Sequence, residues 1–167
     1  MNQLWSPWRS QYIDSFSDTQ KKSSGCFLCD ALQHPDEDKE RFVVARKQTC
    51  FIIMNRYPYN SGHILVVPNT HIGNMAALSE EQYTELMQTV REASVVLTKV
   101  FSPDGINVGA NLGQSAGANI PDHLHFHLVP RWNGDTNFMS TLADVKVISS
   151  SMEDTWEKLT AAFASGS

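Results

Sequence analysis

Three histidines recur at every second position in the stretch His123-Leu-His-Phe-His-Leu-Val-Pro-Arg131, and apolar residues fill the positions between them. Successive side chains of a β-strand point to opposite faces of the sheet. The alternation therefore predicts a strand that carries a row of imidazoles on one face and sends Leu124, Phe126 and Leu128 into a core on the other. The row is roughly 13 Å long, at about 3.3 Å of rise per residue, which is long enough to serve a different site at each end.

This imidazole row has three interpretations. It can be the polar face of a half-exposed strand with no chemical role. It can hold a hydrolytic zinc ion, because neighbouring imidazoles on one face can share a metal that keeps an open position for water. It can also carry out phosphoryl chemistry, in which one imidazole is the nucleophile and the others support it. Three histidines on one face of a Phe/Leu/Val strand favour the two functional interpretations over the first.

The composition is typical of one compact domain. The chain has 167 residues, of which 41% are hydrophobic, enough for a sizeable core. We expect a single domain over residues 25–167, preceded by an aromatic arm over residues 1–24. The net charge of -5 argues against broad nucleic-acid binding, which needs a basic surface. An acidic small molecule remains possible if a few focused donors hold it.

No stretch of the chain approaches the roughly 18 apolar residues of a membrane-spanning helix. The first residues also lack the charged and apolar regions of a signal peptide. We therefore expect a cytoplasmic protein with no membrane partner. In that reducing compartment the Cys26-Phe-Leu-Cys29 motif indicates a metal half-site or a redox pair rather than a disulfide. A redox motif should open a long helix, whereas Pro35 soon interrupts this segment, so we favour half of a zinc site.

The rest of the chain predicts an α+β domain. Short β-branched runs at 42–46, 49–54 and 63–67, and an alternating run at 106–111, each read as a strand. Ser79-Glu-Glu-Gln82 is a capping box that opens a long amphipathic helix, and a short amphipathic helix closes the chain. We expect an antiparallel sheet of about five strands with the long helix packed on one face. The amphipathic helix and the aromatic arm also suggest a homodimer.

The motif His-x-His-x-His followed by two apolar residues resembles the signature of the histidine triad (HIT) family of nucleotide-binding proteins. Two upstream segments, 55–68 and 111–117, resemble the hairpin and the loop that precede the triad in that family. With the cysteine pair, the resemblance covers about residues 25–132, and the family fold agrees with the predicted one. The Trp-rich start and the Pro-Arg-Trp after the triad look most like the bacterial zinc-bearing branch of diadenosine tetraphosphate phosphorylases.

The resemblance implies a role for each end of the imidazole row. At one end it implies a structural zinc ion, with no organic cofactor, held by Cys26, Cys29, His71 and His123. At the other end it implies transfer of a nucleoside monophosphate group through the catalytic residues His125 as nucleophile, His127 and His63. The residues expected to contact the nucleotide are Asn55, Asn111, Gln114, Ser115 and Trp132.

The sequence does not decide which molecule completes the reaction. If orthophosphate attacks the nucleotidyl-histidine, the protein is a diadenosine polyphosphate phosphorylase, which the resemblance favours. If water attacks, it is a hydrolase of dinucleoside polyphosphates or of nucleoside phosphoramidates. A nucleotide-binding module without turnover is the alternative of another class, and the complete triad argues against it.

Overall fold

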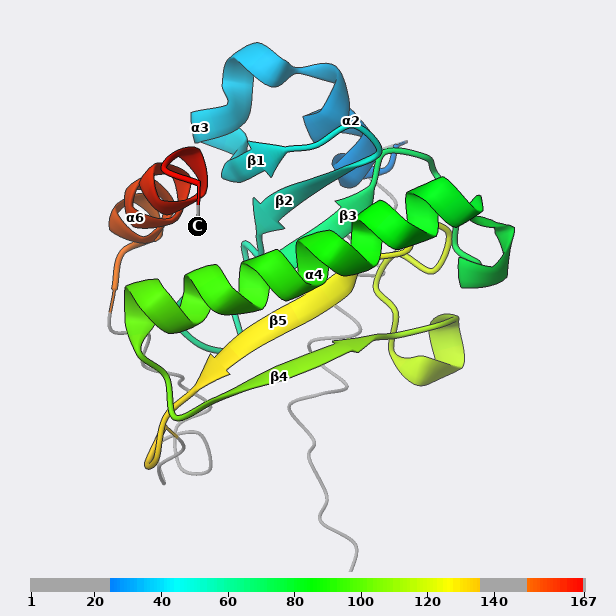
Figure 1. The fold of residues 1–167 in the computed structure, drawn as a ribbon. Coiled ribbons are helices and arrows are strands. Elements are labelled where there is room, and N and C mark those ends of the chain that lie inside the picture. The colour runs from blue at the N-terminus through cyan, green and yellow to red at the C-terminus, as the bar shows by residue number, and fades with distance from the viewer. Residues whose placement is uncertain (1–24, 136–149, 167) are drawn as a thin grey trace, which may run out of the picture.

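The computed structural model describes residues 25–135 and 150–166 (Figure 1). The helices in these segments are α2 (Phe27–Gln33), α3 (Asp38–Arg41), α4 (Glu80–Phe101) and α6 (Met152–Ala164), with short 3-10 helices at Pro35–Glu37, Met75–Ala77 and Gln114–Ala116. The strands are β1 (Val43–Arg46), β2 (Cys50–Met54), β3 (Ile64–Pro68), β4 (Gly105–Ala110) and β5 (Phe126–Arg131). The arm predicted for residues 1–24 lies outside the described residues.

The strands form one five-stranded antiparallel sheet in the order β1-β2-β3-β5-β4. The first three follow one another along the chain. Helix α4 then connects β3 to β4, which lies at the edge of the sheet, and β5 lies between β3 and β4. This confirms the predicted α+β fold, including the antiparallel pairing of the triad strand with the strand around residues 106–111. The triad strand is therefore held on both sides.

Helix α4 lies across one face of the sheet, as Figure 1 shows. It begins at the predicted capping box: the Ser79 hydroxyl accepts from the backbone N–H of Gln82, and the Gln82 side chain accepts from the backbone N–H of Ser79. It ends at Ser102, which adopts a left-handed conformation with φ 45°. The α4 residues buried against the sheet include Leu86, Val90, Ala93, Val96 and Leu97. Helix α6 packs beside α4 and β1, and Trp156 Nε1 donates to the Val43 carbonyl at 2.8 Å.

The opposite face of the sheet is covered in part by α2. Leu28 and Ala31 of α2 pack against Phe51 and Ile53 of β2 and against side chains of β1 and β3. All five residues of β2 are buried because its alternate side chains enter the α4 core and the α2 core in turn. This second core anchors α2, and with it the Cys-x-x-Cys motif, beside the sheet.

The triad strand is shorter than the sequence predicts. Regular pairing begins at Phe126, opposite Ala110, and not at His123. Before that point the backbone N–H of Leu124 donates to the carbonyl of Ile72 at 2.7 Å, so this segment pairs with the loop after β3. The first two triad histidines therefore lie just before β5, and only His127 lies within it.

The acidic, Pro-containing stretch 33–40, whose composition alone indicates a solvated loop, is largely helical in the structure. Pro35 opens a 3-10 helix here, where its missing N–H costs nothing, and α3 ends at Phe42 in a left-handed conformation. Among the helices of the described segments, none has the length and apolar character that crossing a bilayer requires.

Candidate functional site

Two cysteines and two histidines meet beside the start of α2. Cys26 is the N-cap residue of α2 and Cys29 lies in its first turn, while His71 follows β3 and His123 precedes β5. Their Sγ and ring nitrogen atoms all lie within 4.8 Å of one another. Cys26 Sγ is 3.3 Å from His123 Nδ1, and Cys29 Sγ is 3.2 Å from His71 Nδ1. The structure thus brings together the four residues that the resemblance suggests as metal ligands.

The backbone orients His123 toward the thiols. Its Nε2–H donates to the Pro68 carbonyl at 2.9 Å, which leaves a lone pair on Nδ1. Burial lowers the pKa of His123, and burial together with the neighbouring Cys26 raises the pKa of Cys29 to about 11. Two thiols and two imidazoles are the donor set of a closed tetrahedral zinc site, in which the cation offsets the cost of the thiolates. These residues fit a structural zinc ion.

A glycine lets the two histidine-bearing loops approach each other. A Cβ at Gly73 would lie 2.3 Å from the Pro121 carbonyl oxygen and 3.0 Å from the Asp122 Cα. Both neighbours are backbone atoms and cannot rotate away. The glycine therefore allows the segment that carries His71 to pack directly on the segment that carries His123.

The middle histidine, His125, presents a lone pair. Its Nδ1–H donates to the backbone carbonyl of His123 at 2.8 Å. In the neutral imidazole the other nitrogen, Nε2, is then unprotonated and can act as a nucleophile. The side chain is 6% exposed, and this burial lowers its pKa, which keeps the ring neutral near pH 7.

The last triad histidine, His127, presents an N–H instead. The backbone N–H of Tyr59 donates to His63 Nδ1 at 3.1 Å, so His63 carries its proton on Nε2. That Nε2 is 3.0 Å from His127 Nδ1 and donates to it, which places the proton of His127 on its own Nε2. Burial, with a smaller contribution from His125, lowers the pKa of His127 to about 4. The rings of His125 and His127 are 4.9 Å apart at their centroids.

The residues predicted to contact a nucleotide fall in four places. Asn55 lies beside His63, with its amide nitrogen 3.4 Å from His63 Nδ1. Asn111 lines a cleft next to His127 and donates to the Gly117 carbonyl. Gln114 and Ser115 are exposed in a 3-10 helix, and the half-buried Trp132 donates its backbone N–H to Asp135. Asn55 and Asn111 therefore lie near the triad histidines, on opposite sides of His127.

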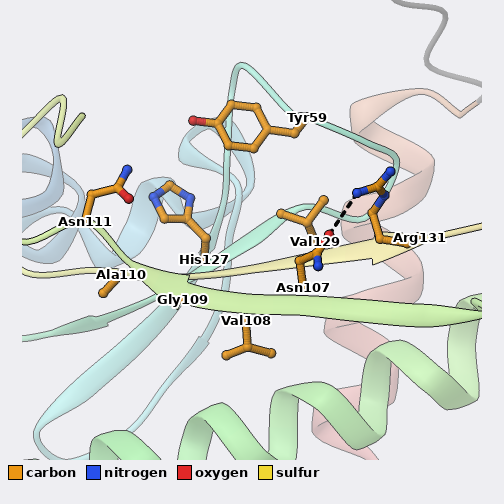
Figure 2. Close-up of a pocket in the computed structure, with 9 residues that line it drawn as sticks. All are labelled: Tyr59, Asn107, Val108, Gly109, Ala110, Asn111, His127, Val129 and Arg131. Atoms are coloured by element: carbon orange, nitrogen blue, oxygen red, sulfur yellow. Dashed lines mark hydrogen bonds between the residues drawn. The ribbon is translucent and has the colours of Figure 1, made fainter. Parts of the chain in front are cut away.

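That cleft has a volume of about 450 Å³ and runs over β4 and β5 (Figure 2). Three polar residues that line it, Tyr59, Asn107 and Arg131, are not among the predicted site residues. The Tyr59 ring stacks over His127, with 5.9 Å between centroids and 14° between planes. Period-two alternation from His127 could have indicated Arg131, because both lie on the same face of β5. Predicting Asn107 as a lining residue requires the register between β4 and β5, and predicting Tyr59 requires the path of the 55–62 turn.

The whole arrangement has counterparts among known proteins. A sequence model of the HIT domain matches residues 36–134. The chain belongs to the HIT domain family. An AP-4-A phosphorylase of Mycobacterium tuberculosis is 36% identical over 157 residues, which cover 93% of this chain and 80% of that protein. A bis(5'-nucleosyl)-tetraphosphatase of Schizosaccharomyces pombe is 33% identical over 56% of this chain and 50% of its own length.

Solved structures of HIT proteins share the fold. A zinc-bound histidine triad family protein from Mycobacterium smegmatis superposes with a TM-score of 0.67, covering 84% of this chain and 94% of that one. Its sequence identity is 23%, so the likeness concerns the fold of this HIT protein and not its ligands.

Proposed function

We propose that this HIT protein transfers an AMP group from diadenosine tetraphosphate to orthophosphate. The observation that carries the proposal is the pair of opposite tautomers on neighbouring rings, because a lone pair on His125 stands beside an N–H on His127. This arrangement suits an in-line attack on phosphorus with a donor for the developing charge. The 36% identity to an AP-4-A phosphorylase supports this substrate and this acceptor.

In the first half-reaction, Nε2 of His125 attacks the α-phosphorus. An N–P bond forms as the bond from that phosphorus to the bridging oxygen breaks, and ATP leaves with the negative charge on its terminal oxygen. His127 Nε2–H donates to an oxygen of the reacting phosphate. The loss of one such donor typically lowers a rate by roughly a hundred- to a thousandfold.

In the second half-reaction, an oxygen of orthophosphate attacks the same phosphorus. The N–P bond breaks, its electron pair returns to His125, and ADP leaves. If water were the acceptor, the product would be AMP and the protein would be a hydrolase of dinucleoside polyphosphates or phosphoramidates. We assign the ribose of the transferred group to the Asn55 side of His127, following the resemblance of the 55–68 segment to the family hairpin.

We also propose that Cys26, Cys29, His71 and His123 hold a structural zinc ion. A closed four-ligand site has no open position for water, and zinc there would cross-link α2 to the loops after β3 and before β5. Holding His123 in place also fixes its backbone carbonyl, which accepts the hydrogen bond that orients His125. The metal would thus support the catalytic histidine without touching the substrate.

The test of the proposed function is incubation with diadenosine tetraphosphate, with and without orthophosphate, and identification of the products by mass. We expect ADP and ATP in the presence of phosphate. AMP formed without phosphate would indicate hydrolysis instead, and tight binding without any product would indicate a binding module.

The covalent step is tested with His125→Ala. This variant should still bind AMP but form no nucleotidyl adduct, and turnover should fall by several powers of ten, on the order of what the loss of a covalent nucleophile costs. The matched control is His34→Ala, because the His34 side chain is 43% exposed and contacts Asp30 of α2, away from the triad. An adduct mapped to another residue, or near-normal turnover by His125→Ala, would refute the assignment.

A further inference from the structure

The cleft beside the triad continues along β5 away from His127. The register places Gly109 opposite His127 and Asn107 opposite Val129. A Cβ built at Gly109 would meet no atom within 4 Å, so the floor of the cleft is open next to His127. Arg131 closes the far end, as Figure 2 shows. It is four residues from His127 in the same strand, so the cleft spans roughly 13 Å at about 3.3 Å per residue.

The Arg131 guanidinium is held in place by a network of hydrogen bonds. Asp135 accepts from its Nε at 2.6 Å and from one terminal nitrogen at 2.9 Å, and Asn107 Oδ1 accepts from the other terminal nitrogen at 2.9 Å. The Asp135 side chain is only 8% exposed and also accepts from Asn60 Nδ2 and from the Trp132 backbone N–H. A buried carboxylate with these partners fixes the direction in which the guanidinium points.

Arg131 keeps donors for a ligand. A guanidinium carries five N–H groups, and the bonds to Asp135 and Asn107 account for three of them. Its side chain remains 44% exposed at the end of the cleft. Because Asp135 compensates the charge, Arg131 would act mainly through directed hydrogen bonds, and the planar fork suits the oxygens of a phosphate chain.

We propose that this cleft holds the departing nucleotide of a dinucleoside polyphosphate, and that Arg131 selects such substrates over nucleoside phosphoramidates. The inference rests on the proposed function, which places the transferred group on the Asn55 side of His127. Asn55 follows β2, whereas the cleft lies over β5 and β4, on the other side of His127 in the sheet order. A second nucleotide is long enough to reach Arg131, whereas the amine that leaves a phosphoramidate is not.

The experiment compares two substrates that transfer the same AMP group. We would measure kcat/KM and adduct formation with diadenosine tetraphosphate plus orthophosphate, and with adenosine 5'-phosphoramidate, for wild type and Arg131→Gln. Loss of a charged hydrogen bond should lower kcat/KM for diadenosine tetraphosphate by about tenfold or more, chiefly through KM. The kcat/KM for the phosphoramidate should stay within about twofold of wild type. This substrate has no second nucleotide, so Arg131 makes no contact with it that the substitution could remove.

A second variant separates the effect on ligand binding from the structural effect of losing the Arg131–Asp135 ion pair. Asn107→Leu keeps the Arg131–Asp135 pair and removes only the oxygen that accepts from Arg131, so it should show the same selective loss to a smaller degree. Arg41→Gln is the matched control, since Arg41 is also paired with carboxylates but lies on α3, away from the cleft. It should change neither substrate.

The outcomes separate the two proposals. If neither substrate forms an adduct on the wild-type protein, the proposed function fails. If both substrates form adducts but Arg131→Gln and Asn107→Leu lower both rates equally, or lower neither, the proposed function stands and the selective role of Arg131 is wrong. An equal loss would place the transferred nucleoside in the cleft.

Discussion

Neighbouring imidazoles of the triad differ because each one meets a different hydrogen-bond partner. His123 and His125 both donate to backbone carbonyls, but through opposite nitrogens, so one directs a lone pair from Nδ1 and the other from Nε2. His127 accepts from His63 and so keeps an N–H. In the proposed function, these three chemically identical side chains serve as a ligand, a nucleophile and a donor, and their hydrogen-bond partners make the distinction.

The burial of His127 should make stability depend on pH. Its folded-state pKa of about 4 lies below the ordinary value of 6.5. Between these values the unfolded chain binds a proton that the folded chain does not, so the free energy of unfolding should fall as pH drops from 6.5 toward 4, by at most about 1.4 kcal/mol per pH unit. Above pH 6.5 this group should contribute no dependence.

Urea unfolding at several pH values between 7 and 5 measures this effect. His127→Gln keeps an acceptor for the His63 N–H but cannot titrate, so its stability should fall less steeply with pH than that of wild type. His34→Gln, which replaces the histidine that directly follows α2, serves as the control for the loss of an imidazole outside the triad. A His127→Gln slope equal to that of wild type would show that this ring is not the source.

That these histidines and cysteines lie together was predictable from sequence, whereas their protonation was not. The two-residue spacing places the histidines together, and the cysteine spacing indicates a metal half-site. The tautomers depend on the carbonyls of Pro68 and His123 and on the N–H of Tyr59, and no local pattern specifies which backbone groups approach a ring. Tyr59 is absent from the predicted site for the same reason, whereas the alternation along β5 is enough to place Arg131 on the face of His127.

At the scale of elements, the site depends on two loops that are held together by close backbone contacts. The loop after β3 and the segment before β5 share the Leu124–Ile72 backbone bond and the close approach at Gly73. The long helix α4 and the strands were predictable from sequence. Each has a hydrophobic repeat or a β-branched run that extends over the whole element. The helices between residues 27 and 41 were not predictable, since elements of four to seven residues are too short to show such a repeat.

We predict that Gly73→Ala disrupts the metal site. The added methyl group would force the Pro121 carbonyl away and move the segment that carries His123, while the core formed by α4 and the sheet stays in place. Zinc content measured on protein purified without chelator should fall from about one equivalent per chain toward the value of Cys26→Ser, and the melting temperature should fall with it.

The control for this element is Gly25→Ala, because a Cβ at Gly25 meets no atom within 4 Å. That variant should keep both its metal and its melting temperature. If Gly73→Ala also kept them, the close approach of the two loops would have no structural importance. If wild-type protein contained no zinc, the proposed metal site itself would be wrong.

At the scale of the whole molecule, β4 forms an edge of the sheet that no strand of residues 25–135 and 150–166 covers. Strand β4 pairs with β5 on one side, and no other strand of the described segments pairs with its second side. Val108, in the middle of β4, points toward the α4 side of the sheet (Figure 2). Its exposed fraction is 50%, and that of Val95 on α4 is 53%. An open edge with exposed apolar side chains is a template for pairing with another chain.

We therefore predict that the protein is a homodimer that pairs through β4, as the amphipathic helix and the aromatic arm also suggest. Val108→Lys places a charge in the contact and should shift the protein toward monomer, raising the dissociation constant by about tenfold or more, since desolvating an unpaired charge is costly. Tyr57→Lys changes a residue that is 60% exposed and lies in the turn between β2 and β3, outside β4, and should leave the assembly unchanged. Sedimentation at micromolar concentration should give a species of twice the 18.7 kDa chain mass for wild type and for Tyr57→Lys. A single wild-type species at the chain mass would rule the dimer out, and a dimer unaffected by Val108→Lys would place the contact on another surface.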